Sequence, residues 1–321
     1  MTPIEIVITV LISCIGLAAL ILFVGGYVTY RMTFYHDPKK NPVDPYRFVK
    51  DDENPISAFG RSLIDSFLPL PYEDLYTTSH DGLKLHARLY MKDESLPFAI
   101  MCHGYKSASV IDFSGGGPDI MSLGYNGIMI DERATSLSEG KSISFGYNES
   151  LDILDWIEFV RKKWGSDKEI ILAGVSMGAA SVIMAAGMGL PENVKAVFAD
   201  CPYSSAKEII TKVIYEMKLP GKLLFPLVRF GGRVWGGFDV CLAEPKKYIK
   251  DAKVPIYIVH GEADDFVPCD MSRELASLYG GAVLNTFPEA HHGTSYLHDV
   301  ERYRGILRHM HDRVANTDQE G

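Results

Sequence analysis

The stretch Glu169-Ile170-Ile171-Leu172-Ala173-Gly174-Val175-Ser176-Met177-Gly178 runs from an apolar segment into a serine between two glycines. The apolar segment predicts a buried strand over 169–173, and the residues that follow predict a helix over 177–189. A serine at such a junction lies in a tight turn, whose flanking positions must lack bulk. Its hydroxyl is then presented above the sheet, next to helical N–H groups that favour negative charge. A serine that simply caps the helix is the alternative.

Strands and helices alternate on both sides of this junction. Two runs around the turn Asp81-Gly82 predict an antiparallel hairpin over 73–79 and 84–90. Short apolar runs predict strands buried on both faces at 98–102, 127–131, 194–199 and 256–259. Further helices are predicted over 149–164, 271–279 and 299–314. This order predicts an α/β fold, a mostly parallel doubly wound sheet with helices on both faces, and catalytic residues at the carboxyl ends of its strands.

Two later strand ends supply an acid and a histidine. Asp264 and Asp265 follow the strand predicted at 256–259, and the pair His291-His292 follows a strand-like run at 282–287. A serine hydroxyl is a poor nucleophile unless a base removes its proton, and the partners are expected in the order serine, acid, histidine. One residue of each pair is therefore the candidate. Asp200 also ends a strand and is the second choice of acid.

The loop after 98–102 reads His103-Gly104-Tyr105. An oxyanion hole needs two N–H donors, and the Met177 amide, just after the serine, is the first candidate. The Tyr105 amide is the second candidate, because Gly104 lets the backbone turn closely. Lining the acyl pocket is the alternative role for the Tyr105 side chain.

The chain resembles the α/β-hydrolase superfamily, and more closely the bacterial membrane-associated serine hydrolases related to serine aminopeptidases and to the catalytic domain of prolyl oligopeptidases. The resemblance covers about residues 72–311. It rests on His103-Gly104, Asp131-Glu132-Arg133, Gly174 to Gly178, Asp200-Cys201-Pro202-Tyr203, His260-Gly261 through Val267-Pro268, and His292-Gly293-Thr294-Ser295-Tyr296.

The resemblance implies that Asp264 rather than Asp265 is the acid, and that His292 rather than His291 is the base. The family commonly has a glycine-containing run after Asp-x-Arg, whereas this chain has Ala134-Thr135-Ser136-Leu137. The departure puts the turn geometry of that loop in doubt, but not the catalytic residues.

Residues 4–30 predict a transmembrane helix, since no charge interrupts the run from Ile6 to Tyr30. A cleaved signal peptide would have basic residues before a shorter apolar run, and a buried core helix is rarely apolar on every face. Basic residues follow the span and predict a cytoplasmic C-terminal domain. These are Arg31, Lys39, Lys40, Arg47 and Lys50.

The rest of the chain divides into a linker and one domain. Prolines and mixed charge at 31–71 predict a linker with one short helix near 58–67, followed by a hydrolase domain over 72–316. The interval 203–253 breaks the alternation and combines aromatic residues with glycines. It predicts a helical cap over the active site, with an insertion that only packs on the surface as the alternative.

The net charge of −9, without a basic block, argues against a nucleic-acid partner. Five cysteines without a CxxC motif suggest neither disulfides nor a zinc site, and no metal or cofactor is expected. The predicted function is that of a serine hydrolase, which cleaves an ester, thioester or amide through an acyl-enzyme intermediate. Acyl esters or lipids are favoured as substrates. The alternatives are a peptidase, a cleaved and secreted enzyme, or a non-catalytic membrane scaffold.

Overall fold

The computed structural model describes residues 1–47, 49 and 54–317, and within them a sheet of eight strands forms the centre. The spatial order is β1-β2-β4-β3-β5-β6-β7-β8, with β1 and β2 antiparallel to their neighbours and the others parallel. The strands are β1 (Glu73–Thr78), β2 (Lys84–Tyr90), β3 (Phe98–Cys102), β4 (Asn126–Asp131), β5 (Ile170–Val175), β6 (Val194–Asp200), β7 (Ile256–Gly261) and β8 (Ala282–Phe287). The predicted hairpin and mostly parallel sheet are confirmed.

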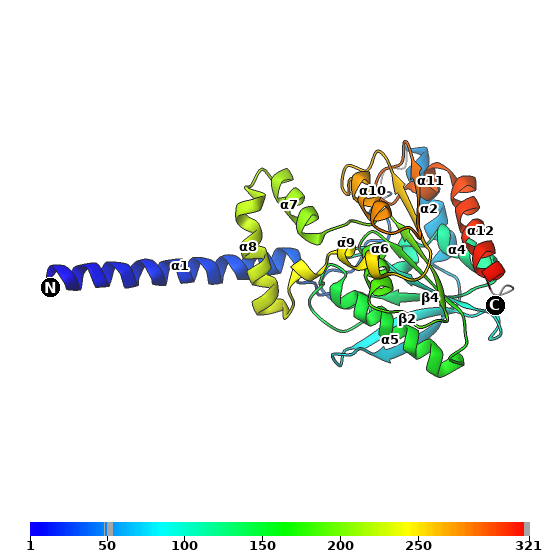
Figure 1. Cartoon of the computed structure of the whole chain (residues 1–321), viewed down its shortest axis with the longest axis horizontal. Coiled ribbons are helices and arrows are strands. Elements are labelled where there is room, and N and C mark those ends of the chain that lie inside the picture. Colours follow the sequence, from blue (N-terminus) through cyan, green and yellow to red (C-terminus); the bar gives the residue numbers. More distant parts are fainter. Residues whose placement is uncertain (48, 50–53, 318–321) are drawn as a thin grey trace.

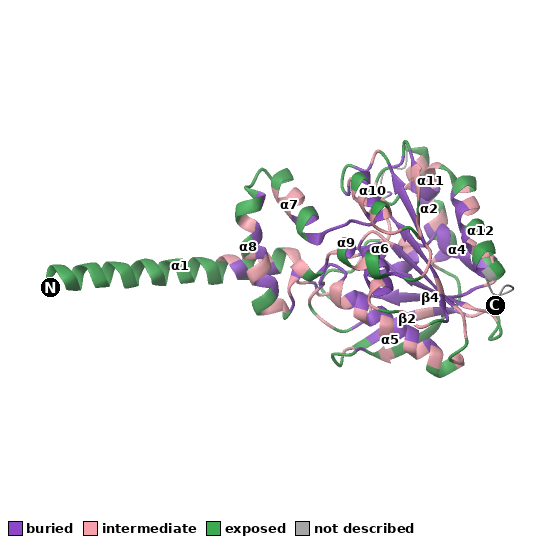
Figure 2. Cartoon of the chain, in the orientation of Figure 1, coloured by how far each residue is buried: buried purple, intermediate pink, exposed green. Residues whose placement is uncertain are grey.

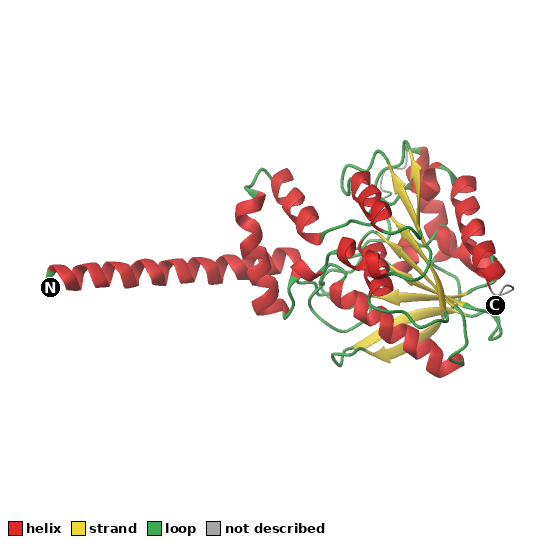
Figure 3. Ribbon diagram, viewed as in Figure 1, coloured by secondary structure: helices red, strands yellow, loops and turns green. Residues whose placement is uncertain are grey.

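Helices cover both faces of this sheet (Figure 1, Figure 3). The longer ones are α1 (Pro3–Thr33), α2 (Pro55–Phe67), α5 (Tyr147–Trp164), α6 (Met177–Gly187), α7 (Ala206–Glu216), α8 (Gly221–Gly231), α10 (Cys269–Leu278) and α12 (Val300–Thr317). Shorter elements are α3 (Ser109–Asp112), α4 (Gly116–Ser122), the π-helix η1 (Gly232–Gly236), the 3₁₀ turns η2 (Val240–Leu242) and η3 (Ile249–Asp251), α9 (Pro245–Tyr248) and α11 (Ser295–His298). The helices predicted after β4, β5, β7 and β8 are all present, with ends that differ by a few residues.

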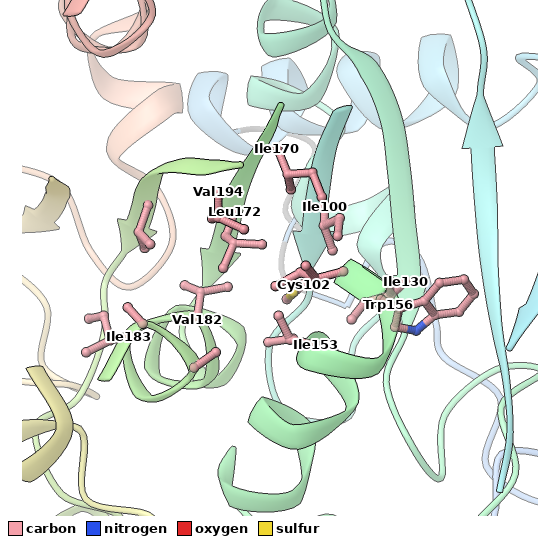
Figure 4. Packing of buried hydrophobic residues seen from close by; sticks show 14 of the residues in the cluster. Ile100, Cys102, Ile130, Ile153, Trp156, Ile170, Leu172, Val182, Ile183 and Val194 are labelled. Atoms are coloured by element: carbon pink, nitrogen blue, oxygen red, sulfur yellow. The ribbon is translucent and has the colours of Figure 1, made fainter. Parts of the chain in front are cut away.

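Alternate residues of the central strands pack into two separate apolar cores, one on each face of the sheet. Ile100 and Cys102 of β3 pack on one face with side chains of α5 and α6 (Figure 4). Ala99 and Met101 pack on the other face with α4 and α12. Both faces of the strands are covered, which explains why these strands are continuous apolar runs.

Helix α4 was not predicted, because Gly115-Gly116-Gly117-Pro118 has the composition of a loop. Its glycines are needed for close packing. A Cβ on Gly117 would lie 2.8 Å from the terminal carbon of Met129, and one on Gly115 would lie 2.6 Å from the ring of Tyr296. Tertiary contacts therefore override the low helix propensity of glycine here.

Helix α1 projects from the body of the molecule (Figure 1), and residues 3–24 are exposed (Figure 2). Contacts with the body begin at Phe23, whose ring lies 4.9 Å from that of Trp235, and continue at Gly25 and Gly26, which pack against α8. Among the described residues, α1 is the one helix long and apolar enough to cross a membrane. Membrane anchors and signal sequences both have helices of this kind.

The segment after α1 packs on the domain. Phe34 is fully buried, and its carbonyl accepts a hydrogen bond from the Ile143 amide at 2.8 Å. Helix α2 lies in the region predicted as a linker and begins at Pro55, because the side chain of Asn54 caps its first turn. Where the structure describes it, this segment is not a free tether.

Residues 203–253, hereafter the cap, contain α7, α8, η1, η2, α9 and η3. A third apolar cluster joins the cap to the end of α1. It contains Tyr30 and Phe34 from α1 and its C-terminal end, Phe225 and Val228 from α8, and Met177 from the first turn of α6. Since Met177 directly follows Ser176, one apolar cluster connects the cap and α1 to the turn that holds the candidate nucleophile.

Candidate active site

Ser176 lies in the turn between β5 and α6, with φ 55° and ψ −111°. Two glycines make this strained turn possible. A Cβ on Gly174 would lie 2.3 Å from the carbonyl oxygen of Gly178, and one on Gly178 would lie 2.1 Å from that of Cys102. The Ser176 side chain does not cap α6, so the alternative of a simple capping serine does not describe this residue.

The structure brings Ser176, His292 and Asp264 together. The Ser176 Oγ lies 2.9 Å from His292 Nε2, and His292 Nδ1 lies 2.7 Å from an Asp264 oxygen. The Asp264 side chain is fully buried, whereas that of His292 is 21% exposed. A hydroxyl, an imidazole and a carboxylate thus form one hydrogen-bonded line, in which Ser176 and His292 are half-buried and Asp264 is buried.

The neighbouring candidates lie elsewhere. Asp265 and His291 are exposed. Asp200, the second choice of acid, accepts a hydrogen bond from the Tyr303 hydroxyl at 2.9 Å, and burial raises its pKa to about 6. A carboxyl group in that setting is poorly suited to hold a charged imidazole, whereas Asp264 is directly bonded to His292.

Asp264 is held from two sides. One carboxylate oxygen accepts the amides of Phe266 and Val267 at 3.0 and 2.8 Å. The other lies 3.2 Å from His260 Nε2, which also donates to the Val267 carbonyl at 2.9 Å. Although burial alone would raise the pKa of Asp264, hydrogen bonds from His260 and His292 hold it well below its usual range. The acid therefore stays ionised at neutral pH.

His260 was not predicted as a site residue. It is fully buried at the end of β7, and its Nδ1 is bound by the Ser272 hydroxyl at 2.7 Å. The signal in the sequence was its place in the His260-Gly261 motif, four residues before Asp264. Cys201 was also missed: its sulfur lies within 4.8 Å of the reactive atoms of Asp264 and His292.

The loop His103-Gly104-Tyr105 lies against the nucleophile. A Cβ on Gly104 would be 3.3 Å from the Ser176 Cβ. His103 is neutral and buried, because its Nε2 accepts the Glu132 amide at 3.1 Å while its Nδ1 donates to the Gly104 carbonyl at 2.7 Å. In a trans peptide the carbonyl and the next N–H point in opposite directions, so the Tyr105 N–H is directed away from His103.

Other side chains fix the same loop. The Asp112 carboxylate accepts the Gly104 amide at 2.7 Å. The guanidinium of Arg47, from the segment after α1, donates to the carbonyls of Tyr105 and Lys106 at 3.2 and 2.5 Å. Neither Arg47 nor Asp112 was predicted to have this role. The Arg47 contact joins distant parts of the chain, and the Asp112 contact depends on the fold of the loop between Gly104 and α3.

The Tyr105 side chain points to the end of α1. Its hydroxyl donates to the Thr33 carbonyl at 2.7 Å, and its ring packs on Phe145 with 5.1 Å between centroids. Burial raises the pKa of this phenol well above its usual range. The loop that offers the second candidate donor is therefore tied to the C-terminal end of α1.

The motif Asp131-Glu132-Arg133 is structural. Arg133 forms hydrogen bonds with Asp152 and Asp81, and so ties the β1–β2 hairpin to α5. In the following loop, Ala134 and Ser136 have φ of 60° and 44°, a conformation that favours glycine. The backbone thus makes left-handed turns without the glycines that the family commonly has here.

Two groups of side chains among the described residues have the spacing of metal ligands. The first, Cys201 with Asp264 and His292, belongs to the site above, and burial raises the pKa of its thiol well above the usual value. The second is His80, Asp152 and Asp155, in which Asp152 is already bound by Arg133. Neither group favours a metal, since a cysteine ligand must be deprotonated and Asp152 is occupied.

Comparisons with known proteins agree with this geometry. The family model of X-Pro dipeptidyl-peptidase (S15 family) matches residues 81–213. The protein YqkD of Bacillus subtilis (strain 168) is 25% identical over 220 residues, which are 68% of this chain and 72% of YqkD. The thiohydrolase aneE of Aspergillus aculeatus is 30% identical over 152 residues, 46% of this chain and 47% of aneE.

Among solved structures, the esterase Pf2001 of Pyrococcus furiosus is similar with a TM-score of 0.61 and 22% identity, over 79% of this chain and 94% of the esterase. This likeness concerns the fold. The S15 match includes the loop at 103–105 and the serine turn at 174–178. The chain therefore has the fold of the α/β-hydrolases, and its matches to the S15 family and to a thiohydrolase indicate a hydrolase of the serine type.

Proposed function

We propose that this hydrolase is anchored in a membrane and cleaves carboxylic esters, with Ser176 as nucleophile, His292 as base and Asp264 as acid. The observation that supports this most is the line of hydrogen bonds from Ser176 through His292 to Asp264, with distances of 2.9 and 2.7 Å. A serine hydroxyl acts as a nucleophile at neutral pH when a base so placed takes its proton.

In the proposed reaction, His292 Nε2 accepts the Ser176 proton while Oγ bonds to the ester carbonyl carbon. The oxyanion accepts hydrogen bonds from the Met177 and Tyr105 amides. Collapse of this intermediate breaks the ester bond, and the leaving alcohol takes the proton from His292. Water then repeats the sequence on the acyl-enzyme and releases the carboxylic acid, while Asp264 stabilises the charged imidazole in both halves.

Two arguments favour esters over amides. Pf2001 is an esterase and aneE is a thiohydrolase. The cap brings apolar side chains, among them Phe225, to the cluster that contains Met177, which suits an apolar acyl group. A peptidase is the second candidate, because the S15 family that matches residues 81–213 is named for a dipeptidyl-peptidase.

The anchor is proposed from α1. Residues 3–24 as a helix measure about 33 Å, close to the hydrocarbon thickness of a bilayer. A cleaved signal peptide is disfavoured because the C-terminal part of α1 is built into the fold: Tyr30 is buried, and Gly26 packs against α8. Arg31, Lys39 and Lys40 follow the span, which favours a cytoplasmic domain.

Fluorophosphonate labelling of the full-length protein in detergent tests the nucleophile. The wild type and a Ser277→Ala control, altered at an exposed serine, should both be labelled, and Ser176→Ala should not. An unlabelled wild type with normal thermal unfolding would contradict the proposal and favour a non-catalytic scaffold. Hydrolysis of acyl esters of graded chain length, measured beside aminoacyl and peptidyl amides, separates the two candidate activities.

The anchor is tested apart from the chemistry. The protein should remain in the membrane pellet after carbonate extraction, at its full uncleaved mass. Protease should digest the domain in inverted vesicles and spare it in right-side-out vesicles. Recovery in the medium at a lower mass, or digestion only from the outer face, would contradict the anchor or its orientation respectively.

A further inference from the structure

Helix α8 has two apolar faces: one is buried in the third cluster, and the other contacts α1 only in part. Phe225 and Val228 are buried in the third cluster, at 6% and 2% exposure. On the opposite side, a stripe of four apolar residues at helical spacing is open to solvent or half-buried. It consists of Leu223, Leu227 and Phe230 of α8 and Val234 of η1, the π-helix that continues α8, with Leu223 at 73% and Val234 at 50% exposure. A helix apolar on both sides needs a second partner.

The stripe lies on the side of α8 that faces the free part of α1. The two helices cross with their backbones in contact, since a Cβ on Gly231 would lie 2.3 Å from the Gly26 carbonyl (Figure 1). The buried side of α8 clusters with Phe34, farther along α1. Leu227 and Phe230 from the stripe instead approach Gly25 and Gly26, towards the exposed span.

Aromatic residues gather where α8 and η1 cross α1. The Trp235 ring lies 4.9 Å from that of Phe23 and 5.5 Å from that of Tyr27, between centroids. Tryptophan and tyrosine are enriched where a protein passes from hydrocarbon to the headgroup layer. About 20 residues of helix fill the hydrocarbon core, so a span that begins near Ile4 ends beside Trp235.

The charge of the region favours an anionic partner. The whole chain has a net charge of −9, yet residues 206–236 contain six basic side chains against two acidic ones. The basic residues are Lys207, Lys212, Lys218, Lys222, Arg229 and Arg233. Arg229 and Arg233 also bind Asp239, whereas Lys222, directly before Leu223, is exposed.

We propose that α8 is an interfacial helix, whose stripe of Leu223, Leu227, Phe230 and Val234 lies in the headgroup layer of an anionic leaflet. This rests on the proposed membrane anchor. An amphipathic helix with an apolar stripe and basic flanks binds such a surface through apolar burial and attraction to anionic lipids. The opposite side of α8 belongs to the third cluster, which also contains Met177, the residue next to the nucleophile.

The location also defines the substrate class. An acyl ester dissolved in the leaflet has its polar headgroup at the level of α8, and the candidate nucleophile lies behind this helix. A substrate of this class reaches Ser176 from the membrane side, with its acyl chain passing along the cap. Soluble short-chain esters do not depend on this route.

A fluorescent probe measures the depth of α8. Full-length protein with Cys241→Ser is labelled with NBD at the native Cys14 on α1. With Cys14→Ser in addition, it is labelled at Leu223→Cys or at Val283→Cys, an exposed apolar position at the amino end of β8. In vesicles of phosphatidylcholine with 30% phosphatidylglycerol, the emission of the probe at 223 should be blue-shifted. Lipids with a shallow doxyl group should quench it, because an interfacial helix penetrates only to the boundary between headgroups and acyl chains.

The other positions make the result decisive. The probe at position 14 should be quenched by deep doxyl lipids, and the probe at 283 should remain in water. A water-exposed probe at 223 beside a deep probe at 14 overturns the interfacial helix and leaves the anchor standing. A water-exposed probe at 14 overturns the anchor, and the inference with it. Removing phosphatidylglycerol should reduce quenching at 223 but not at 14.

An activity measurement addresses the route of the substrate. The double variant Leu223→Ser/Val234→Ser should hydrolyse diacylglycerol in the same vesicles with a kcat/KM lower by about fivefold or more. Its hydrolysis of soluble p-nitrophenyl butyrate should stay within about twofold of wild type. An equal loss on both esters would contradict the membrane route. A wild type that cleaves neither ester contradicts the proposed chemistry, while the probe experiment still decides the position of α8.

Discussion

The edge of the sheet that holds the proposed catalytic residues, hereafter the catalytic edge, differs from the cap in how completely its side chains are buried. At the catalytic edge, which holds Ser176, Asp264 and His292, close contacts with backbone leave no room at Gly174 and Gly178. In the cap, α8 buries Phe225 but leaves Leu223 almost free. The side chains of the first region are buried or half-buried by their neighbours, whereas the second presents an apolar surface that no described part of the chain covers. Substitutions at the catalytic edge should therefore lower activity or stability strongly. In the cap, the loss of stability should depend on which face of α8 is changed.

The largest effect is expected at the acid. Asp264→Asn removes the charge that holds the His292 tautomer, and turnover should fall by about 10⁴-fold. Asp200→Asn is the matched control and should retain activity within about tenfold, because that carboxyl bonds to Tyr303. Steady-state kinetics on a soluble ester measures both. Survival of activity in Asp264→Asn would make Asp200 the acid.

The next effect concerns the turn itself. The methyl group of Gly178→Ala would lie 2.1 Å from the carbonyl oxygen of Cys102, so the backbone of the catalytic edge must move. We expect destabilisation by about 3 kcal/mol or more, measured by thermal unfolding. Gly305→Ala, in α12 with no neighbouring atom within 4 Å, should instead be neutral or stabilise by up to about 1 kcal/mol. Equal unfolding temperatures for the two variants would refute the close-packing argument.

A buried acid at the same edge predicts a pH effect. Burial, strengthened by Glu149, raises the pKa of Glu132 well above its usual value, and its oxygens have no hydrogen-bond partner among the described residues. The folded state thus keeps a proton that the unfolded chain releases above about pH 4.5. Stability should fall as pH rises, by up to about 1.4 kcal/mol per unit.

Glu132→Gln should remove this dependence, so its gain in unfolding temperature over wild type should grow from pH 5 to pH 8. Glu149→Gln is the contrast. The Glu149 carboxylate accepts the amides of Ser144 and Gly146, both at 2.8 Å, and its loss should destabilise the protein at both pH values. A Glu132→Gln gain that is the same at pH 5 and pH 8 would refute a neutral Glu132.

The smallest effect is expected on the open side of α8. In detergent, Leu223→Ala should change the free energy of unfolding by less than about 0.5 kcal/mol, because this side chain is 73% exposed. Phe225→Ala, two residues on, should cost about 3 kcal/mol or more. If the two variants unfold alike, the two faces of α8 do not differ as described, and the contrast between edge and cap is lost.

Much of the catalytic edge could be predicted because its chemistry is local. The order of Ser176, Asp264 and His292, each after an apolar strand, fixed the candidates, although the choice between adjacent residues needed the family resemblance. His260 and Arg47 could not be predicted in the same way. Their contacts, with Asp264 and with the Tyr105 carbonyl, depend on how distant segments pack.

The fold shows the same division. Strands buried on both faces were recognised to within about two residues, since their composition alone reveals them. Helix α4 was missed because Gly115 and Gly117 at its start are selected by close contacts and not by helix propensity. The crossing of α8 over α1 was missed as well, because residues nearly 200 positions apart form it.

The contact between Gly26 and Gly231 determines where the protein can be cut. Removing residues 1–30 would delete the whole predicted span, but it would also delete Tyr30 and the surface on which α8 rests. A fragment starting near Phe23 keeps that surface, including the ring partner of Trp235. It should give a monodisperse crystallisation sample, whereas the shorter fragment should expose the underside of the cap and aggregate.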